Sequence, residues 1–277
     1  MKRVTTVLLG LAGLLFCAGT VGGANADTLD NVKQKGTLVV GVKADYPPWG
    51  MRDSNGNIVG MEIDMANDVA RRLGVKLTLV PVLSSNRMQM LQQGQIDLMI
   101  ATLSVSDERR KAVGVIEPLY YAAGVAMLVN RSAGIMGSAD LKGKPVCALQ
   151  GVSYNREVSE KYVGGDLVAF KGVAEDEQAL LDRRCAAWVY DDAILIYKKN
   201  SEPDKWKDYD VIMMPDLPAL QWGLAVRSEE RVGPWGTYMS KVVQDWHKSG
   251  LLLELEKKWL GGNTEWLIQA HDKAKMQ

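Results

Sequence analysis

The sequence predicts an α/β chain folded as two lobes with a cleft between them. Short apolar segments alternate with helical patterns along residues 37–102, and the same alternation begins again after residues 122–130. Strands that alternate with helices predict βαβ units and a mainly parallel sheet. Two such series in one chain therefore predict two sheets. Each would form a lobe of about a hundred residues, which is within the usual size range of a domain.

The first series predicts the first part of lobe I, residues 27–127. An apolar run at 37–42 has the character of a buried strand, and Asn55-Gly56 predicts a turn after it. Residues 62–74 have the spacing of an amphipathic helix that ends at Gly74. The other expected elements are a strand at 76–82, a helix at 86–94 that ends at Gly94, and a strand at 96–102.

The second series predicts lobe II, residues 128–220. Its expected elements are a strand at 144–151, a helix from about Tyr154, a strand at 167–172, a helix at 175–184, a strand at 185–192 and a helix from Ala193. The chain then returns to lobe I at residues 221–277. A strand at 218–227 leads to two amphipathic helices within 237–262, broken at Ser249-Gly250.

Residues 1–26 have the layout of a secretory signal peptide. Lys2 and Arg3 precede an apolar run that ends in small residues, so cleavage is expected after Ala26. A transmembrane anchor is the alternative, but the run is short and rich in glycine for a membrane span. Cys17 follows Phe16, where a lipoprotein signal carries a small residue. The pattern thus favours a soluble exported protein.

The charge balance gives no indication of a nucleic-acid or membrane-surface partner. The chain has 33 basic and 33 acidic residues, and removal of Lys2 and Arg3 leaves it nearly neutral. The two histidines, His247 and His271, lie far from any cysteine pair. We therefore expect no metal site, no cofactor and no Cys-His or Ser-His catalytic arrangement.

Cys147 and Cys185 are the cysteines that remain after cleavage. Both lie in or next to predicted strands, and disulfides persist in the compartments that exported proteins reach. A bond between neighbouring strands is one interpretation, and closing a loop of this length would stabilise the fold by about 4 kcal/mol. Two buried free thiols are the alternative.

Polar residues gather where the predicted strands end. In open parallel sheets, ligands bind beyond the carboxyl ends of the strands, near helix N-termini. The side chains at these ends carry both charge signs and several hydroxyls, which is what a zwitterion between the lobes requires. They are Lys43, Asp45, Tyr46, Thr102, Ser104, Arg109, Ser153, Asp191 and Asp192.

Two adjacent arginines, Arg109 and Arg110, follow a hydroxyl-rich segment. Ser106 can cap the helix that contains them. Successive helical residues point about 100° apart, so only one of the two can face a cleft. An arginine can hold a carboxylate bidentately. The alternative is that both are solvated surface arginines.

Several segments look like those of the bacterial periplasmic amino-acid-binding proteins, the solute receptors of ABC importers (solute-binding protein family 3). The most specific are "GTLVVG" at 36–41, "YPPW" at 46–49, and the S-x-[ST]-x-x-R run from Ser104 to Arg109. The resemblance covers essentially all of the chain after residue 26. It implies a type II, Venus-flytrap fold with hinge crossings near 126–130 and 218–223. It also implies a monomeric periplasmic receptor, not an enzyme, that delivers an amino acid to a membrane ABC permease.

The resemblance assigns roles to individual residues. Arg109, rather than Arg110, matches the family's α-carboxylate-binding arginine, and Asp191 matches the acid that holds the ligand's ammonium group. Tyr46 matches an aromatic residue that packs on the ligand. The hydroxyl and backbone donors of the family fall on Thr102, Ser104 and Ser153. The two cysteines also resemble a disulfide found in some members.

The ligand is expected to be acidic, because the chain carries basic residues at the cleft. Lys43 stands where members that bind cationic amino acids carry an acid, and Arg87 lies in "SSNR" near the cleft. The segments "GVKADYP", "SSNR" and "YDDA" look more like the glutamate/aspartate-binding branch. Lys43 and Arg87 can supply the positive charge that a side-chain carboxylate needs. The alternatives are that Lys43 leans to solvent and that Arg87 caps or packs on its own helix.

The sequence leaves three other functions open. A receptor for glutamine or for a broad range of polar amino acids is the alternative most similar to the expected function. A periplasmic cyclohexadienyl dehydratase on the same scaffold would need a cleft acid, for which Glu117 and Asp192 are the candidates. The sensor lobe of a receptor would normally continue into a transmembrane helix.

Overall fold

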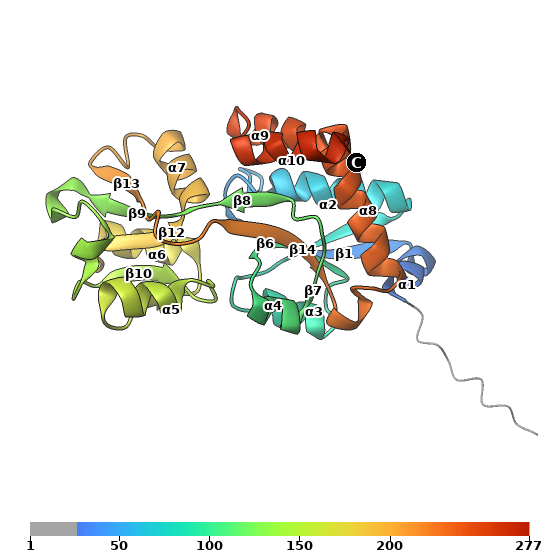
Figure 1. The fold of residues 1–277 in the computed structure, drawn as a ribbon, viewed down its shortest axis with the longest axis horizontal. Helices are drawn as coiled ribbons and strands as arrows, with labels where there is room; N and C mark the ends of the chain where they lie inside the picture. Colours follow the sequence, from blue (N-terminus) through green and yellow to red (C-terminus); the bar gives the residue numbers. More distant parts are fainter. Residues whose placement is uncertain (1–26, 277) are drawn as a thin grey trace, which may run out of the picture.

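The computed structural model describes residues 27–276 of the 277-residue chain. Figure 1 shows two α/β lobes side by side, connected by extended strands that run between them. This confirms the predicted fold class. The predicted signal peptide, including Cys17, lies outside the described residues. Among residues 27–276, no helix has both the length and the apolar character to span a membrane.

Lobe I contains the larger sheet. Its strands are β1 (Thr37–Val42), β5 (Lys76–Pro81), β6 (Leu98–Ser104), β7 (Gly114–Val115), β8 (Tyr121–Ala123) and β14 (Leu220–Val226). They lie in the order β5-β1-β6-β14-β7, and β8 also pairs with β14. β1 is parallel to both of its neighbours, whereas β14 runs antiparallel to β6. A small second sheet contains β2 (Asp45–Tyr46), β3 (Gly50–Arg52) and β4 (Ile58–Val59).

The helices of lobe I come from both ends of the chain. They are α1 (Thr28–Lys35), α2 (Met61–Leu73), α3 (Arg87–Gln92), α4 (Asp107–Ala112), α8 (Pro234–Ser249), α9 (Leu251–Leu260) and α10 (Glu265–Lys275), with a short 3-10 turn at Ser228–Glu230. α2 ends as predicted at Gly74, whose φ of 67° is the left-handed conformation that glycine adopts readily. The predicted break at Gly250 separates α8 from α9. α10 was not expected, and it begins after Thr264, whose hydroxyl accepts a hydrogen bond from the Leu267 N–H at 3.4 Å.

Lobe II contains the second sheet. Its strands are β9 (Val125–Asn130), β10 (Val146–Leu149), β11 (Val168–Phe170), β12 (Ala187–Asp191) and β13 (Tyr209–Met213), in the order β11-β10-β12-β9-β13. Its helices are α5 (Asn155–Glu157), α6 (Val173–Leu181) and α7 (Asp192–Ser201), with a π-helical segment at Val158–Val163 and 3-10 turns at Arg131–Ala133 and Ser138–Leu141. β10 is parallel to β11 and β12, whereas β9 is antiparallel to β12 and β13.

The chain changes sheet twice. β8 pairs in lobe I and β9 in lobe II, so the first change occurs at Gly124. The boundary expected between residues 127 and 128 falls inside β9. The second change occurs between β13 and β14, at residues 214–219. We therefore propose lobe boundaries at Gly124 and within 214–219.

A cluster of aromatic rings lies beside the crossings, at the base of the cleft. The ring of Trp222 in β14 is 5.1 Å from that of Tyr121 in β8 and 5.4 Å from that of Trp49. All three side chains are buried. Aromatic pairs at such spacings stabilise a fold beyond the burial of their area. These contacts give the two connecting strands a rigid base beneath the cleft.

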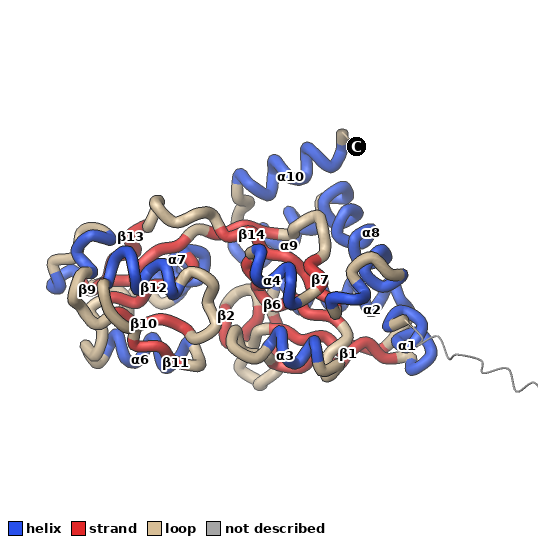
Figure 2. The backbone as a smooth tube through the Cα atoms, turned by 60° about the horizontal axis from the view of Figure 1, so that its bottom comes forward, coloured by secondary structure: helices blue, strands red, loops and turns tan. Residues whose placement is uncertain are grey.

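The lobes touch one another in this structure. Figure 2 shows β2 at the edge of lobe I that faces lobe II, and α6 of lobe II packs against β2. Gly151 of lobe II approaches so closely that a Cβ there would lie 2.7 Å from the backbone of Ser84 and Ser85 in lobe I. Its φ of 82° also favours glycine. The cleft is therefore closed.

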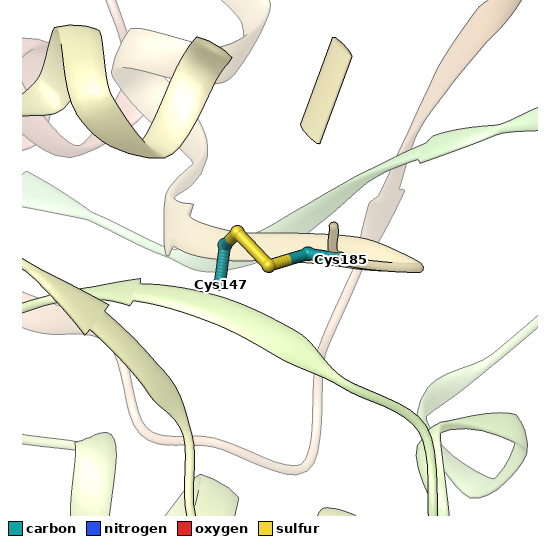
Figure 3. Close-up of a disulfide and its surroundings, with 2 residues drawn as sticks. All are labelled: Cys147 and Cys185. Carbon is teal, nitrogen blue, oxygen red and sulfur yellow. A yellow bond between two sulfur atoms is a disulfide. The ribbon is translucent and has the colours of Figure 1, made fainter. Parts of the chain in front are cut away.

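A disulfide joins Cys147 in β10 to Cys185, just before β12, and Figure 3 shows the bridge between these neighbouring strands. The two Cα atoms are 5.5 Å apart. This excludes the alternative of free thiols.

Candidate functional site

Arg109 is buried at the cleft and its guanidinium group links the two lobes. α4 places it there, because the Ser106 hydroxyl caps the helix by accepting the Arg109 N–H at 3.3 Å. Nη1 donates to the Ser104 carbonyl at 2.7 Å, and Nη2 donates across the cleft to the Gly151 carbonyl at 2.8 Å. Burial lowers the pKa of Arg109 to about 10, so the group stays charged at neutral pH. No acidic side chain of residues 27–276 forms an ion pair with it.

Arg110 lies on the next face of α4, away from these contacts. Its Nη2 is 2.6 Å from Oε1 of Glu117, and both side chains are partly exposed. The two adjacent arginines thus differ as helix geometry requires: one is buried between the lobes and the other forms a surface ion pair.

Asp191 lies at the carboxyl end of β12 and accepts a hydrogen bond from each lobe. Its Oδ1 accepts the Tyr154 hydroxyl at 2.8 Å, and its Oδ2 accepts the Tyr46 hydroxyl of lobe I at 2.9 Å. Burial raises the pKa of Asp191 to about 6, while the two tyrosine hydroxyls oppose this shift. The side chain is therefore mainly ionised at neutral pH. Tyr46 is itself held by edge-on contacts with Trp49 and Trp222.

Thr102 has an unusual backbone conformation at the end of β6. Its φ is 46°, in the left-handed region that β-branched residues rarely adopt. The Thr102 N–H donates to Oε1 of Glu62 at 2.7 Å, and the Thr102 carbonyl accepts Nη1 of Arg87 at 3.0 Å. The same Glu62 oxygen accepts the Tyr120 hydroxyl. These bonds hold the lip of the cleft in a conformation that costs about 1–3 kcal/mol.

The sequence analysis did not identify Glu62 as a site residue, although its position on an apolar helix face indicates a buried acid. It lies on the face of α2 that also carries Met65, Ala66 and Val69, and an acid on the apolar face of a helix has to find buried partners. The side chain is fully buried, and burial raises the pKa of Glu62 to about 6.

Replacing Glu62 with alanine is expected to lower the free energy of unfolding by about 2–4 kcal/mol. The Thr102 N–H and the Tyr120 hydroxyl would be left buried without an acceptor, and each such group costs about 1–3 kcal/mol. Urea denaturation of the ligand-free protein measures this. Glu62→Gln keeps an acceptor oxygen and should lose much less; equal losses for the two variants would contradict the role assigned to these bonds.

Lys43 is fully buried and does not lean to solvent. It follows β1, with its Nζ 2.8 Å from Oδ1 of Asp45 and 3.5 Å from Oγ of Ser84. Burial lowers the pKa of Lys43, and the Asp45 carboxylate opposes this shift. The lysine thus forms a polar pair with Asp45 at the cleft.

Arg87 is also buried, and it does not pack on its own helix. Its Nη1 donates to the carbonyls of Ala101 and Thr102 in β6. Its Nε has no hydrogen-bond partner within the described residues. A buried guanidinium with a free donor has unused capacity for one more acceptor.

The two serines of the predicted set differ. Ser104 is buried beside Arg109 and provides a carbonyl to it. The Ser153 side chain is exposed, and its hydroxyl forms no hydrogen bond with any residue of 27–276. Its neighbours Gly151 and Tyr154 make the contacts of this loop instead.

The two candidate acids for an elimination reaction have other partners. Glu117 pairs with Arg110 at the surface. Asp192 accepts the Gly124 N–H at 2.9 Å and thereby fixes the N-terminus of α7 to the first crossing between lobes. Among residues 27–276, no group of three or more His, Cys, Asp or Glu side chains is placed to hold a metal ion.

The sequence of the chain matches a known protein family. Residues 38–262 match the model of the bacterial extracellular solute-binding proteins, family 3. The chain belongs to this family. The match spans both lobes and the closed cleft between them, and it confirms the resemblance that the sequence motifs indicated.

Named relatives of this solute-binding protein bind different amino acids. The ABC transporter glutamine-binding protein GlnH of Bacillus subtilis is 30% identical over 84% of this chain and 85% of its own length. The glutamate/aspartate import solute-binding protein of Salmonella typhimurium is 27% identical over 75% of this chain and 73% of its own length. The solved structure of holo ArgBP from T. maritima has a TM-score of 0.72 and 31% identity, covering 83% of this chain and 99% of that one.

Proposed function

We propose that this solute-binding protein captures an α-amino acid between its lobes in the periplasm and delivers it to an ABC permease. One observation carries the proposal: Arg109 and Asp191 are buried groups of opposite charge, and each is hydrogen-bonded across the cleft. An α-amino acid presents a carboxylate and an ammonium group that complement this pair. Arg109 binds the carboxylate and Asp191 binds the ammonium group. Thr102 and Ser104 form the polar lip beside them, and Tyr46 packs on the ligand.

Closure follows from where these residues lie. The ligand first contacts the lobe I surface of Thr102, Ser104 and Arg109, and lobe II then adds Asp191 and the loop that contains Gly151. A ligand favours the closed state only by making contacts that the open state lacks. The hydrogen bonds from Arg109 to Gly151 and from Tyr46 to Asp191 occupy these groups in the closed cleft. The ligand's charged groups take over part of these bonds. We assign no ligand contact to the exposed Ser153.

An acidic side chain is the ligand chemistry that we favour. Lys43 and Arg87 are both buried at the cleft, and Nε of Arg87 is a donor without a partner. A carboxylate on the ligand would satisfy it. Glutamate and aspartate are therefore the proposed ligands, as for the Salmonella relative.

Glutamine is the second candidate, and the Lys43–Asp45 pair favours it. The pair offers one donor and one acceptor, which suits the carboxamide of glutamine better than a second carboxylate. The relative from Bacillus subtilis is a glutamine-binding protein.

Isothermal titration calorimetry tests the proposed function. The chain from residue 27 is unfolded and refolded to remove any bound ligand, and is titrated with glutamate, aspartate, glutamine and arginine. Glutamate or aspartate is expected to bind at least about tenfold more tightly than glutamine, a difference of about 1.4 kcal/mol. Binding of glutamine or arginine without binding of either acid would refute acidic specificity. No binding by any amino acid would refute the receptor function.

Asp45→Asn is expected to shift selectivity toward the acids. The variant removes the carboxylate that neutralises Lys43. The ratio of glutamate affinity to glutamine affinity should therefore rise by about tenfold, because the buried positive charge then gains its anionic partner from the ligand. Asp204→Asn removes an equal charge from an exposed site in lobe II and serves as the control. An unchanged ratio in Asp45→Asn would mean that Lys43 does not contact the ligand's side chain.

A further inference from the structure

A second acid, on lobe II, lies in a helix that packs against the strand containing Asp45. Asp176 is in the first part of α6, and α6 packs against β2, which contains Asp45. The Asp176 side chain is completely buried. Neither of its carboxylate oxygens has a hydrogen-bond partner within the described residues, whereas Oδ1 of Asp45 is paired with Lys43. The buried carboxyl group of Asp176 in lobe II is thus near enough to the Asp45 carboxylate of lobe I for their charges to interact.

The positive charge near Asp45 and Asp176 is too small to neutralise two ionised carboxylates. Lys43 is the cation at the pair, and its Nζ is 2.8 Å from Asp45. Glu175, next to Asp176 on α6, adds a further negative charge while it accepts the N–H groups of Lys171 and Gly172. The helix N-terminus favours an anion, yet no N–H group of α6 donates to the Asp176 side chain. Two ionised acids and one lysine leave this place with excess negative charge.

The strands of lobe II that pack on α6 add no cation at Asp176. Lys198 of α7 and Lys205 also reach α6, but both form ion pairs with Glu177. β10 and β11 have no charged side chains, and the one charged residue of β12 is Asp191, which accepts the hydroxyls of Tyr46 and Tyr154. A proton on one of the two carboxyl groups is the simplest way to remove the repulsion, because burying like charges together strongly disfavours the doubly ionised form.

We propose that closure of the lobes over a ligand creates a proton-binding site between Asp45 of lobe I and Asp176 of lobe II, so that the receptor takes up a proton with its amino acid. The inference rests on the proposed function, since it requires a ligand that drives closure. When the lobes separate, α6 leaves β2 and Asp176 returns to solvent. The proton is then released together with the amino acid.

The electrostatics of the closed state agree with this site. Burial, followed by the charges of Glu175 and Asp45, raises the pKa of Asp176 to about 8. In the open state, an exposed aspartate has its ordinary pKa of about 4. The closed state therefore binds more protons between these two values. Between about pH 6, below which Asp191 becomes protonated, and pH 8, this site makes affinity fall by up to about tenfold per pH unit as pH rises, and its contribution is constant above pH 8.

Proton uptake can be measured directly. The chain from residue 27 is titrated at pH 6.5 with the amino acid that binds most tightly, in two buffers with different ionisation enthalpies. The dependence of the observed enthalpy on the buffer gives the number of protons bound. Wild type is expected to take up about one proton more than Asp176→Asn, which has nearly the same shape and cannot ionise. Asp182→Asn, an exposed acid at the other end of α6, should behave as wild type.

The remaining outcomes each decide the inference. Equal proton numbers for wild type and Asp176→Asn would overturn it. An affinity at pH 8 that rises with sodium in wild type but not in Asp176→Asn would also overturn it, because the pair would then hold a cation instead of a proton. If Asp176→Asn no longer binds an amino acid, Asp176→Ala, which also cannot ionise, takes its place and must lose the same proton. A wild-type protein that binds no amino acid contradicts the proposed function, whereas binding without the extra proton contradicts only this inference.

Discussion

Arg109→Ala is expected to weaken the binding of every α-amino acid by at least about a hundredfold. The wild-type guanidinium is buried and has no carboxylate partner among the described residues, so an incoming α-carboxylate would form its only ion pair. Each charge-assisted hydrogen bond contributes about 1.5–3 kcal/mol, and a bidentate contact loses two of them. Calorimetric titration with glutamate and with the other amino acids that bind measures the loss.

Arg110→Ala is the matched control, since it removes the same side chain one residue away. This arginine forms a surface ion pair with Glu117, and such pairs contribute about 0–1 kcal/mol. Affinity should stay within a few-fold of wild type, and so should the midpoint of thermal unfolding. Equal losses of affinity in the two variants would show that Arg109 does not bind the carboxylate.

Replacing both cysteines, Cys147→Ala with Cys185→Ala, is expected to lower the free energy of unfolding by about 4 kcal/mol. The bond closes a segment with a sequence separation of 38 residues, and opening it returns that loop entropy to the unfolded chain. The bond also joins β10 to the start of β12, the central pair of the lobe II sheet. Urea denaturation of the ligand-free protein provides the measurement.

Reduction of the wild-type protein is the control for this variant. Wild type in excess reductant should unfold at nearly the same urea concentration as the double alanine variant, because both lack the bond. The reductant should leave the variant unchanged. A loss below about 1 kcal/mol in the variant would mean that the bond contributes little to the stability of lobe II.

Local patterns were sufficient to predict most of the regular elements. β1, β6 and β12 are apolar runs that lie inside the sheets, and buried strands of this kind are evident from composition alone. α2 was predicted from its amphipathic spacing and from Gly74. α10 was missed because much of its surface is polar and only Leu267 among its residues is fully buried, so its apolar signal is weak.

The lobe boundary depends on pairing, which local patterns do not determine. β9 reads as a single apolar run, and its partners β12 and β13 lie about sixty and eighty residues further along the chain. The sequence therefore placed the crossing near its middle, whereas the boundary that we propose from strand pairing lies at Gly124. β13 was missed for a related reason: its burial is partial and its neighbour in the sheet is distant in sequence.

At the site, single residues were easier to predict than their contacts. Arg109 and Asp191 could be selected because they follow buried strands and match family motifs. The sequence placed Lys43 and Asp45 at the same strand end but did not predict that they pair, because the chain bends at Ala44 between β1 and β2. The packing of α6, which contains Asp176, against the strand of Asp45 was not predictable from local patterns, because it forms only when the two lobes of the folded chain meet. Ser153 was expected at the cleft, but the local turn exposes it.

The most direct test of amino-acid capture compares glutamate with two analogues that each lack one α-group. Glutarate lacks the ammonium group that we assign to Asp191, and 4-aminobutyrate lacks the carboxylate that we assign to Arg109. Calorimetric titration of ligand-free wild type should give saturable binding of glutamate and a loss of at least about a hundredfold for each analogue, because each leaves one buried charge without its partner. Analogues that bind as tightly as glutamate would contradict recognition of the α-amino acid by Arg109 and Asp191.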